Sequence, residues 1–189
     1  NMFIKKVKIK NFQSHLDNEL ELKPGINFII GSSESGKSAI VRALRLVILN
    51  DLSRKGYITH GKKETEITLE LENGIKIKRL KSDKENSYTI IKDDKEEKFE
   101  FVGDDVPKAV REIIRMDKVK LDEENNLNIN FSLQNELYFI VDKSASIKAK
   151  FVGFLCQQNI LDLTLQNINK KIKNLNYDNQ VLQKEIEEI

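Results

Sequence analysis

Eight consecutive residues, Gly31 to Ser38, constrain the fold of this chain more than any other part of its sequence. They read Gly-Ser-Ser-Glu-Ser-Gly-Lys-Ser and match the pattern GxxxxGK[ST] at every fixed position. The almost wholly apolar run Ile26–Ile30 precedes them, and apolar residues recur at helical spacing after them, at Ile40, Val41, Leu44, Val47 and Ile48. This order predicts a strand buried on both faces, a glycine-rich loop, and an amphipathic helix over about residues 37–50.

The residue types in this loop indicate phosphate binding. The two glycines permit backbone angles at which successive N–H groups face one anion. Lys37 brings a positive charge to the β- and γ-phosphates, the Ser38 hydroxyl is a ligand for Mg²⁺, and the following helix directs its positive end at the same phosphates. We therefore predict ATP and Mg²⁺ as cofactors, bound by Gly31, Ser32, Ser33, Glu34, Ser35, Gly36, Lys37, Ser38 and Ala39.

Alternation of apolar and polar residues predicts further strands along the chain. They are expected at residues 3–9, 19–22, 65–71, 75–80, 88–91, 98–102 and 127–133. Asn73-Gly74 is a strong hairpin signal, and Pro107 marks the start of a short helix with Val110, Ile113 and Ile114 as its buried stripe. The fold class is therefore α/β, with an antiparallel β-meander in the middle of the chain.

From Ser144 onward the sequence follows a helical pattern. This segment contains one glycine, Gly153, and no proline. The apolar residues alternate steps of four and three, which is a heptad seam with a polar residue at one a position. The seam consists of Leu161, Leu165, Ile168, Ile172, Leu175, Asn179, Leu182, Ile186 and Ile189. Such a helix extends about 40 Å, so a protruding coiled coil is expected, with an amphipathic surface helix as the alternative. We predict a globular lobe over residues 2–143 and a helical segment over 144–189, and we expect the protein to continue beyond Ile189.

Composition narrows the class of protein. Lys+Arg total 32 and Asp+Glu total 30, so the net charge of +2 excludes a strongly basic nucleic-acid-binding tail. The single cysteine, Cys156, excludes an internal disulfide framework and is expected to be a small buried residue. No run approaches the about 18 apolar residues that span a bilayer, so a soluble cytoplasmic protein is expected. His15 and His60 are attributed to solvent or to a local hydrogen bond.

Three features together resemble the N-terminal half of an SMC-like ABC ATPase head, of the type found in SbcC and its Rad-type counterpart in double-strand-break repair. They are the run Asn11-Phe12-Gln13-Ser14-His15, the phosphate loop that follows it, and the C-terminal coiled coil. The runs Pro24–Gly31 and Gly61–Ile67 are also similar to that family. The resemblance implies the N-terminal lobe of a P-loop NTPase of the ABC type, and ATP hydrolysis by the full-length protein.

The chain departs from that family at two places. Gln13 stands where relatives usually carry an arginine near the nucleotide phosphates, and Ser33-Glu34 stands where they often carry Asn-Gly. Gln13 is kept as a candidate nucleotide contact, although a neutral amide supplies no charge. By the same resemblance, Gln134 is a candidate Q-loop residue that would complete the Mg²⁺ shell with Ser38 or orient water. The alternative is a surface glutamine at a strand end.

Two parts that this family needs for hydrolysis are absent from the sequence: an acidic Walker B strand and a Ser-Gly-Gly signature loop. Leu137–Val141 followed by Asp142 is the one apolar run that ends in an acid, and no second carboxylate follows. No catalytic residue is therefore assigned in this chain, which is expected to turn over little ATP alone. The resemblance implies four partners and no membrane: the missing C-terminal half of the head, a second head in a homodimer, a nuclease subunit and double-stranded DNA.

Other readings of the chain stay open. Two basic clusters are candidate DNA contacts or, alternatively, lysines that protect strand edges: Lys5, Lys6, Lys8 and Lys10, and Lys76, Lys78, Arg79 and Lys81. The head could be RecF-like or of the condensin SMC type. A small-molecule kinase would need its own acidic strand and an arginine-bearing lid. A non-enzymatic coiled-coil adaptor would bind no nucleotide, which Lys37→Ala tests.

Overall fold

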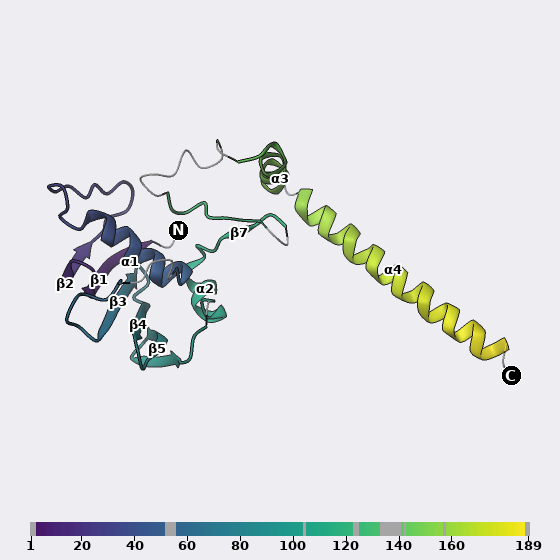
Figure 1. The fold of residues 1–189 in the computed structure, drawn as a ribbon, viewed down its shortest axis with the longest axis horizontal. Coiled ribbons are helices and arrows are strands. Elements are labelled where there is room, and N and C mark those ends of the chain that lie inside the picture. The colour runs from purple at the N-terminus through teal and green to yellow at the C-terminus, as the bar shows by residue number, and fades with distance from the viewer. Residues whose placement is uncertain are drawn as a thin grey trace. The chain divides into compact units, whose positions relative to one another are not determined.

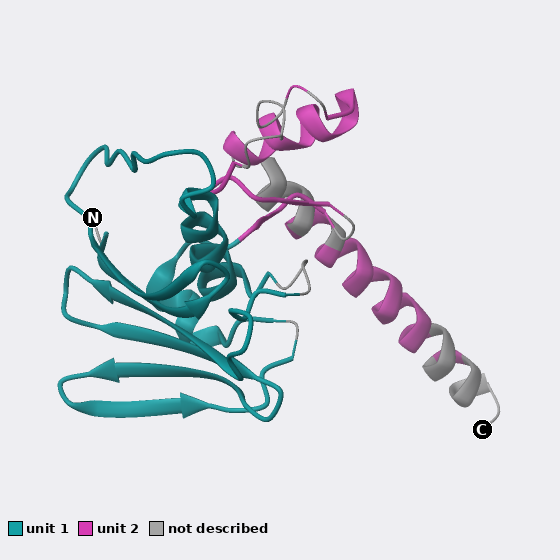
Figure 2. Cartoon of the chain, turned by 60° about the vertical axis from the view of Figure 1, so that its left-hand side comes forward, with its two compact units in different colours: residues 1–117 teal, residues 118–189 magenta. Residues whose placement is uncertain are grey.

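The computed structural model of the chain describes residues 3–51, 56–103, 105–122, 125–132, 141, 143–156 and 158–187. It divides into two compact units, Asn1–Asp117 and Lys118–Ile189 (Figure 2). The domain boundary that the sequence predicts, between residues 143 and 144, is a different division and stays a prediction.

Unit 1 is built on one antiparallel sheet with the strand order β2-β1-β3-β4-β5-β6. The strands are β1 (Ile4–Phe12), β2 (His15–Glu21), β3 (Glu64–Leu71), β4 (Lys76–Ser82), β5 (Asn86–Lys92) and β6 (Lys95–Phe99). Two helices complete the unit, α1 (Lys37–Leu49) and α2 (Lys108–Ile114). Helix α1 contacts β1, β3 and β4 (Figure 1). The predicted α/β fold with an antiparallel meander is confirmed.

Alternation explains which face of the sheet is buried. Alternate strand residues, among them Val7, Ile9, Ile67, Leu69 and Ile77, are fully buried, as are Ala43, Leu46 and Val47 of α1. Successive strand residues point to opposite faces, so one set forms the core with the apolar stripe of the helix. The predicted stripe of α2 is confirmed at Val110 and Ile114, whereas Ile113 is half-buried.

Two of the three turns of the meander follow directly from their residues. The Asn73-Gly74 hairpin is confirmed by the pairing of Glu70 with Lys76. Asp93 and Asp94 both have positive φ, 49° and 59°, as a two-residue type I′ turn requires. This tight turn pairs Lys92 with Lys95, so β6 begins three residues before the predicted 98–102 strand.

The prediction of a strand at Ile26–Ile30 is wrong. The segment belongs to no strand, and Ile26, Phe28 and Ile30 are 85%, 83% and 91% exposed. A strand buried on both faces needs neighbouring strands and covering layers, and no described segment pairs with this run. The phosphate loop is therefore preceded by an uncovered apolar segment.

Unit 2 contains the strand pair β7 (Val119–Lys120) and β8 (Asn126–Leu127) and the helices α3 (Ala145–Leu155) and α4 (Gln158–Glu187). The predicted strand at 127–133 is wrong over residues 128–132, since none of them belongs to a strand and Ile129 is half-exposed. Residue 133 lies outside the described residues. Ser144 caps α3 by accepting from the Ile147 N–H. Cys156 is exposed, contrary to expectation, because α3 buries none of its residues.

The predicted long C-terminal helix is confirmed as α4, which has 30 residues. Four seam residues are exposed on it: Leu165, Ile168, Ile172 and Leu175. Asn179 is exposed as well. An apolar stripe that faces solvent on a helix of this length is typical of a coiled-coil strand without its partner. Within the part of the chain that the structure describes, no helix is both long and apolar enough to cross a membrane.

Candidate nucleotide-binding site

The loop geometry requires glycine at position 36 and packs closely around Gly31. Gly36 is the N-cap of α1 in the left-handed conformation, with φ 88°. A Cβ on Gly36 would lie 2.5 Å from the Ser14 hydroxyl oxygen, and one on Gly31 would lie 2.8 Å from the Ser35 hydroxyl oxygen. Another residue at Gly36 would therefore be strained, whereas at Gly31 the Ser35 hydroxyl would have to turn aside.

The Lys37 ammonium lies over the loop. Its Nζ donates to the Gly31 carbonyl at 2.9 Å, to the Ser35 hydroxyl at 3.3 Å and to the Ser32 carbonyl. Such a cation can exchange loop carbonyls for phosphate oxygens without leaving the loop.

The start of α1 adds N–H donors to that charge. The first intrahelical bond runs from the Ala39 N–H to the Gly36 carbonyl at 2.8 Å, so the N–H groups of Lys37 and Ser38 lie ahead of it. No acidic residue occupies the first turn of the helix. An ammonium, N–H donors that precede the first helical bond and the positive end of a helix suit an anion with several oxygens, so a nucleotide phosphate fits this loop.

Glu34 is the one strained residue within the loop. Its φ of 62° is left-handed, a conformation that glycine adopts freely and other residues adopt at a cost of about 1–2 kcal/mol. The side chain is exposed. The glycine that relatives often carry here would relieve this strain, so the departure noted in the sequence has a structural consequence.

The structure brings the run Asn11–His15 against the loop. His15 is 5% exposed, and its Nε2 lies 3.1 Å from the Gly36 carbonyl oxygen. The attribution of His15 to solvent or to a local bond is wrong, because its partner lies 21 residues away. No spacing in the sequence indicates this contact, which exists only because the turn between β1 and β2 lies against the start of α1. His60 is exposed, as expected.

The side chain of Gln13 lies beside α1. Its Oε1 accepts from Arg42 Nε at 2.8 Å, a contact that the sequence analysis missed. Its backbone N–H donates to the Tyr57 carbonyl at 2.7 Å, and its carbonyl accepts from the Thr59 hydroxyl at 2.8 Å. A nucleotide contact by Gln13 stays a prediction, with a cationic side chain now beside it.

The metal ligands are less well defined. Ser38 is exposed at the start of α1, so its hydroxyl is accessible. Gln134 and most of the run Leu137–Val141, with Asp142, lie outside the described residues. Among the described residues no group of three His, Cys, Asp or Glu side chains could hold a metal ion.

Arg79, a candidate DNA contact, is fully buried, so that part of the DNA hypothesis is wrong. Its guanidinium donates to Asn50 Oδ1 at 2.8 Å and to the Ser87 carbonyl at 3.0 Å, and lies 4.4 Å from the centre of the Tyr88 ring. Tyr88 donates to the carbonyls of Leu46 and Val47 at 3.1 and 3.0 Å. Burial lowers the pKa of Arg79 and raises that of Tyr88. These contacts hold the C-terminal end of α1.

Acidic neighbours accompany the partly exposed lysines of both clusters. Each lysine of β1 pairs with an acidic residue on β2, namely Lys6 with Glu21, Lys8 with Glu19 and Lys10 with Asp17. On β3, Lys6 and Lys10 pair with Glu70 and Glu66. The pair of Lys6 and Glu19, at 2.8 Å, raises the lysine pKa and lowers the glutamate pKa.

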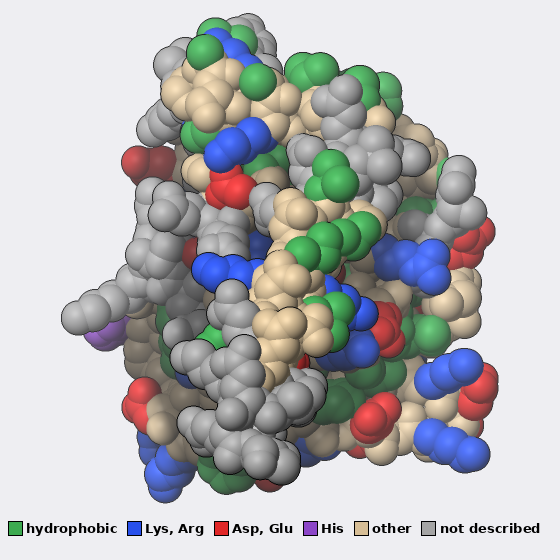
Figure 3. Space-filling model, turned by 90° about the vertical axis from the view of Figure 1, so that its right-hand side faces the viewer, with side chains coloured by type: hydrophobic (Ala, Val, Ile, Leu, Met, Phe, Trp, Pro, Cys, Tyr) green, Lys and Arg blue, Asp and Glu red, His purple; other side chains and the backbone are tan. Residues whose placement is uncertain are grey.

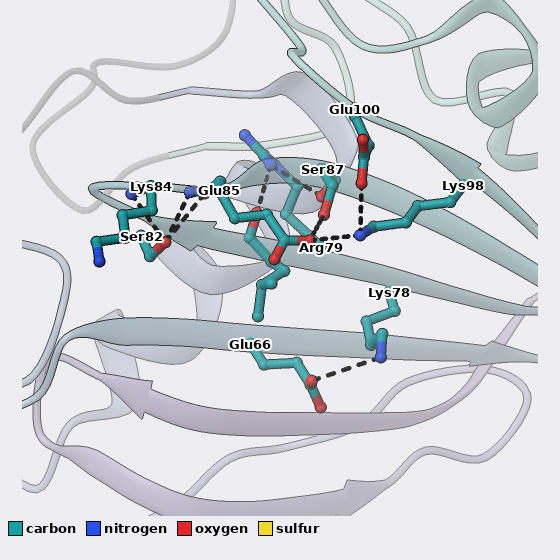
Figure 4. A network of polar contacts seen from close by, with 10 residues as sticks. Glu66, Lys78, Arg79, Ser82, Lys84, Glu85, Ser87, Lys98 and Glu100 are labelled. Atoms are coloured by element: carbon teal, nitrogen blue, oxygen red, sulfur yellow. Dashed lines mark hydrogen bonds and ion pairs between the residues drawn. The ribbon is translucent and has the colours of Figure 1, made fainter.

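The same pattern continues across the sheet. Lys78 lies 3.7 Å from Glu66, and Lys98 lies between Glu85 and Glu100 (Figure 4). Charges of both signs are interspersed on the face that Figure 3 presents. Cross-strand ion pairs stabilise a sheet and weaken its attraction for phosphates, so the structure favours the strand-protecting reading of these lysines.

The sequence matches the family model of the AAA domain over residues 6–189. It is 32% identical over 178 residues to the DNA double-strand break repair Rad50 ATPase of Methanocaldococcus jannaschii, covering 91% of this chain and 17% of that protein. It is 38% identical over 78 residues to Structural maintenance of chromosomes protein 6 of Saccharomyces cerevisiae, covering 38% of this chain and 7% of that protein. The chain therefore spans a small part of these curated relatives.

A solved structure from work on ATP-driven dimerization and DNA-stimulated activation of SMC ATPases has the same fold. It superimposes with a TM-score of 0.56 at 17% identity, covering 84% of this chain and 99% of that chain. The phosphate loop and the family match over residues 6–189 lead to one conclusion: the chain belongs to the AAA domain family, and its fold is that of the SMC ATPase structure.

Proposed function

We propose that this chain is the ATP-binding half of an SMC-like ATPase head that acts in DNA double-strand-break repair or recombination. The geometry of Lys37 and the start of α1 carries the proposal, because an ammonium and helix N–H groups converge on one loop. The proposed nucleotide contacts are Gln13 and the loop residues with Ala39: Gly31, Ser32, Ser33, Glu34, Ser35, Gly36, Lys37 and Ser38.

Each group has a distinct part. Lys37 would transfer hydrogen bonds from the loop carbonyls to phosphate oxygens, and the N–H groups that lead α1 would bind the same oxygens. Ser38 and Gln134 are the proposed ligands of Mg²⁺. When bound, the ion neutralises phosphate charge, and the nucleotide supplies the phosphoanhydride bond that hydrolysis breaks.

The exposed run Ile26–Ile30 supports a missing C-terminal half of the head. An exposed apolar segment beside the phosphate loop is suited to become a central strand when strands from another polypeptide segment flank it. Walker B and signature residues would come from that half and from a second head. The chain alone is therefore expected to bind ATP-Mg²⁺ and to hydrolyse it slowly.

In the complete protein, ATP would drive dimerisation of two heads, and this closure would control engagement of double-stranded DNA and a nuclease subunit. The exposed seam of α4 supports a coiled-coil connection through which such a movement would be transmitted. A cytoplasmic location is part of the proposal. An SMC head outside the nuclease-associated branch is the second candidate, favoured by the match to the yeast SMC protein.

ATP binding measured by calorimetry in the presence of Mg²⁺ tests the proposal. Lys37→Ala should weaken binding at least tenfold, on the order of 1.4 kcal/mol. Lys95→Ala, which removes an exposed lysine on β6, is the matched control and should bind as the wild type does. A wild-type chain that binds no ATP, or binding that survives Lys37→Ala, would contradict the proposal and favour an adaptor with a vestigial loop.

A further inference from the structure

His15 joins the end of the first strand pair to the phosphate loop. Its Nε2 faces the Gly36 carbonyl oxygen at 3.1 Å. A carbonyl oxygen only accepts hydrogen bonds, so Nε2 carries a proton and donates it. The same oxygen accepts from the N–H groups of Ala39 and Ile40 at 2.8 and 3.3 Å. Gly36 is thus held by its own helix on one side and by His15 on the other.

The orientation of this carbonyl determines where the next N–H points. A trans peptide unit is planar, with its C=O and N–H directed oppositely. When His15 fixes the Gly36 carbonyl, the Lys37 N–H of the same peptide unit is directed away from His15. That N–H is one of the donors ahead of the first intrahelical bond, where an anion binds.

The turn that carries His15 is itself well supported. Phe12 is buried in the core, and the Thr59 N–H donates to the Asn11 carbonyl at 2.9 Å. The space beside Gly36 is filled, since a Cβ there would lie 2.5 Å from Ser14 Oγ and 2.9 Å from His15 Nε2. The phosphate loop therefore cannot move toward this turn without displacing Ser14 and the buried His15.

We propose that His15 is a positioning residue for phosphate binding, which holds the Gly36–Lys37 peptide unit so that its N–H faces the phosphates. The inference rests on the proposed nucleotide binding and adds a residue outside the loop to it. His15 itself does not contact the ligand. Its effect should fall on the phosphate part of the nucleotide and leave the rest of the fold intact.

Two substitutions separate the hydrogen bond from the volume of the ring. His15→Phe keeps a ring and removes the donor, and His15→Gln keeps an N–H donor. The chain has only two histidines, so His60→Phe at an exposed site is the matched control. We expect His15→Phe to weaken ATP-Mg²⁺ binding about five- to tenfold, the loss of one hydrogen bond. His15→Gln and His60→Phe should stay within about twofold of the wild type.

Tripolyphosphate as a competitor of a fluorescent ATP analogue identifies which part of the ligand is affected. If His15 acts on the phosphates, His15→Phe weakens the binding of tripolyphosphate and of ATP by the same factor. The measurement is made below the melting temperature of every variant, where all of them are folded. Equal binding by His15→Phe and the wild type would overturn the inference. So would a loss confined to ATP, with tripolyphosphate unaffected.

A spectroscopic readout covers the case in which His15→Phe fails to fold. Nitrogen-15 NMR of the wild-type chain distinguishes the two ring nitrogens of each histidine. His15 should show a protonated Nε2 in the absence of nucleotide, and a bare Nε2 with the proton on Nδ1 would overturn the inference. ATP binding that depends on Lys37 but not on His15 would contradict this inference alone, whereas absence of ATP binding would overturn the proposed function and the inference together.

Discussion

The two ends of α1 differ in how their backbone groups are satisfied. At the C-terminal end, carbonyls of Leu46 and Val47 accept from the buried Tyr88 hydroxyl, and Asn50 accepts from Arg79. At the N-terminal end, the loop before Lys37 is exposed and the leading N–H groups precede the first helical bond. The buried end anchors the helix, and the open end keeps donors available for a ligand. Stability and binding are thus separated along one helix.

The largest effect on stability is expected for Arg79→Met, which tests the buried end of α1. The substitution leaves Asn50 and the Ser87 carbonyl without their donor inside the core, so it should lower the free energy of unfolding by about 3–5 kcal/mol. Urea denaturation measures the loss. Lys78→Met is the matched control, since Lys78 is partly exposed on the same strand and its ion pair with Glu66 is worth less than about 1 kcal/mol.

ATP affinity of the folded fraction should not change in Arg79→Met. If Arg79→Met and Lys78→Met lost the same free energy of unfolding, the buried network would not anchor the helix. A loss of affinity without a loss of stability would show that the two ends of α1 are not separate.

A smaller effect is expected for Tyr88→Phe, which removes the hydroxyl that bonds both carbonyls. The free energy of unfolding should fall by about 1–2 kcal/mol near neutral pH. The folded-state pKa of Tyr88 lies above its ordinary value of 10.0 because of burial. The stabilising preference for the neutral phenol is therefore fully present below pH 10.0 and is lost as pH rises through the folded-state pKa.

Unfolding curves between neutral and alkaline pH test the sign of this dependence. Wild-type stability should decline above pH 10.0 more steeply than that of Tyr88→Phe, so the difference between them narrows. Tyr57→Phe is the comparison, because burial also raises the pKa of that half-buried tyrosine. A constant difference across this range would contradict the assignment to Tyr88.

The smallest effect is expected at the open end, for Glu34→Gly. The substitution relieves a left-handed φ of 62° and removes a negative charge from the loop. Because glycine also gains freedom in the unfolded chain, stability should rise by at most about 1 kcal/mol. ATP affinity should rise by about two- to fivefold, since less charge repels the phosphates. Calorimetry with Glu34→Gln, which removes the charge and keeps the side chain, separates the effect of the charge from the effect of the backbone strain. Weaker ATP binding by both Glu34→Gly and Glu34→Gln would contradict this prediction.

Local patterns predicted the elements that depend on local geometry. The loop from Gly31 to Ser38, helix α1, the Asn73-Gly74 hairpin and the long helix α4 were all evident from spacing and turn residues. The same methods failed at Ile26–Ile30, where an apolar run indicated burial but no described segment covers it. They also misjudged Arg79, since a lysine-rich strand gives no sign that one of its cations points into the core.

The sequence by itself determined the phosphate loop, the periodicity of strands and helices, and the family. These features arise from residues close together in the chain, whose backbone angles and side-chain spacing act locally. The tertiary structure alone decided that His15 holds Gly36, that Arg42 reaches Gln13, and that Arg79 and Tyr88 hold the end of α1. Such contacts join distant segments, and they form because burial of one sheet face against α1 brings polar groups together that must then find partners.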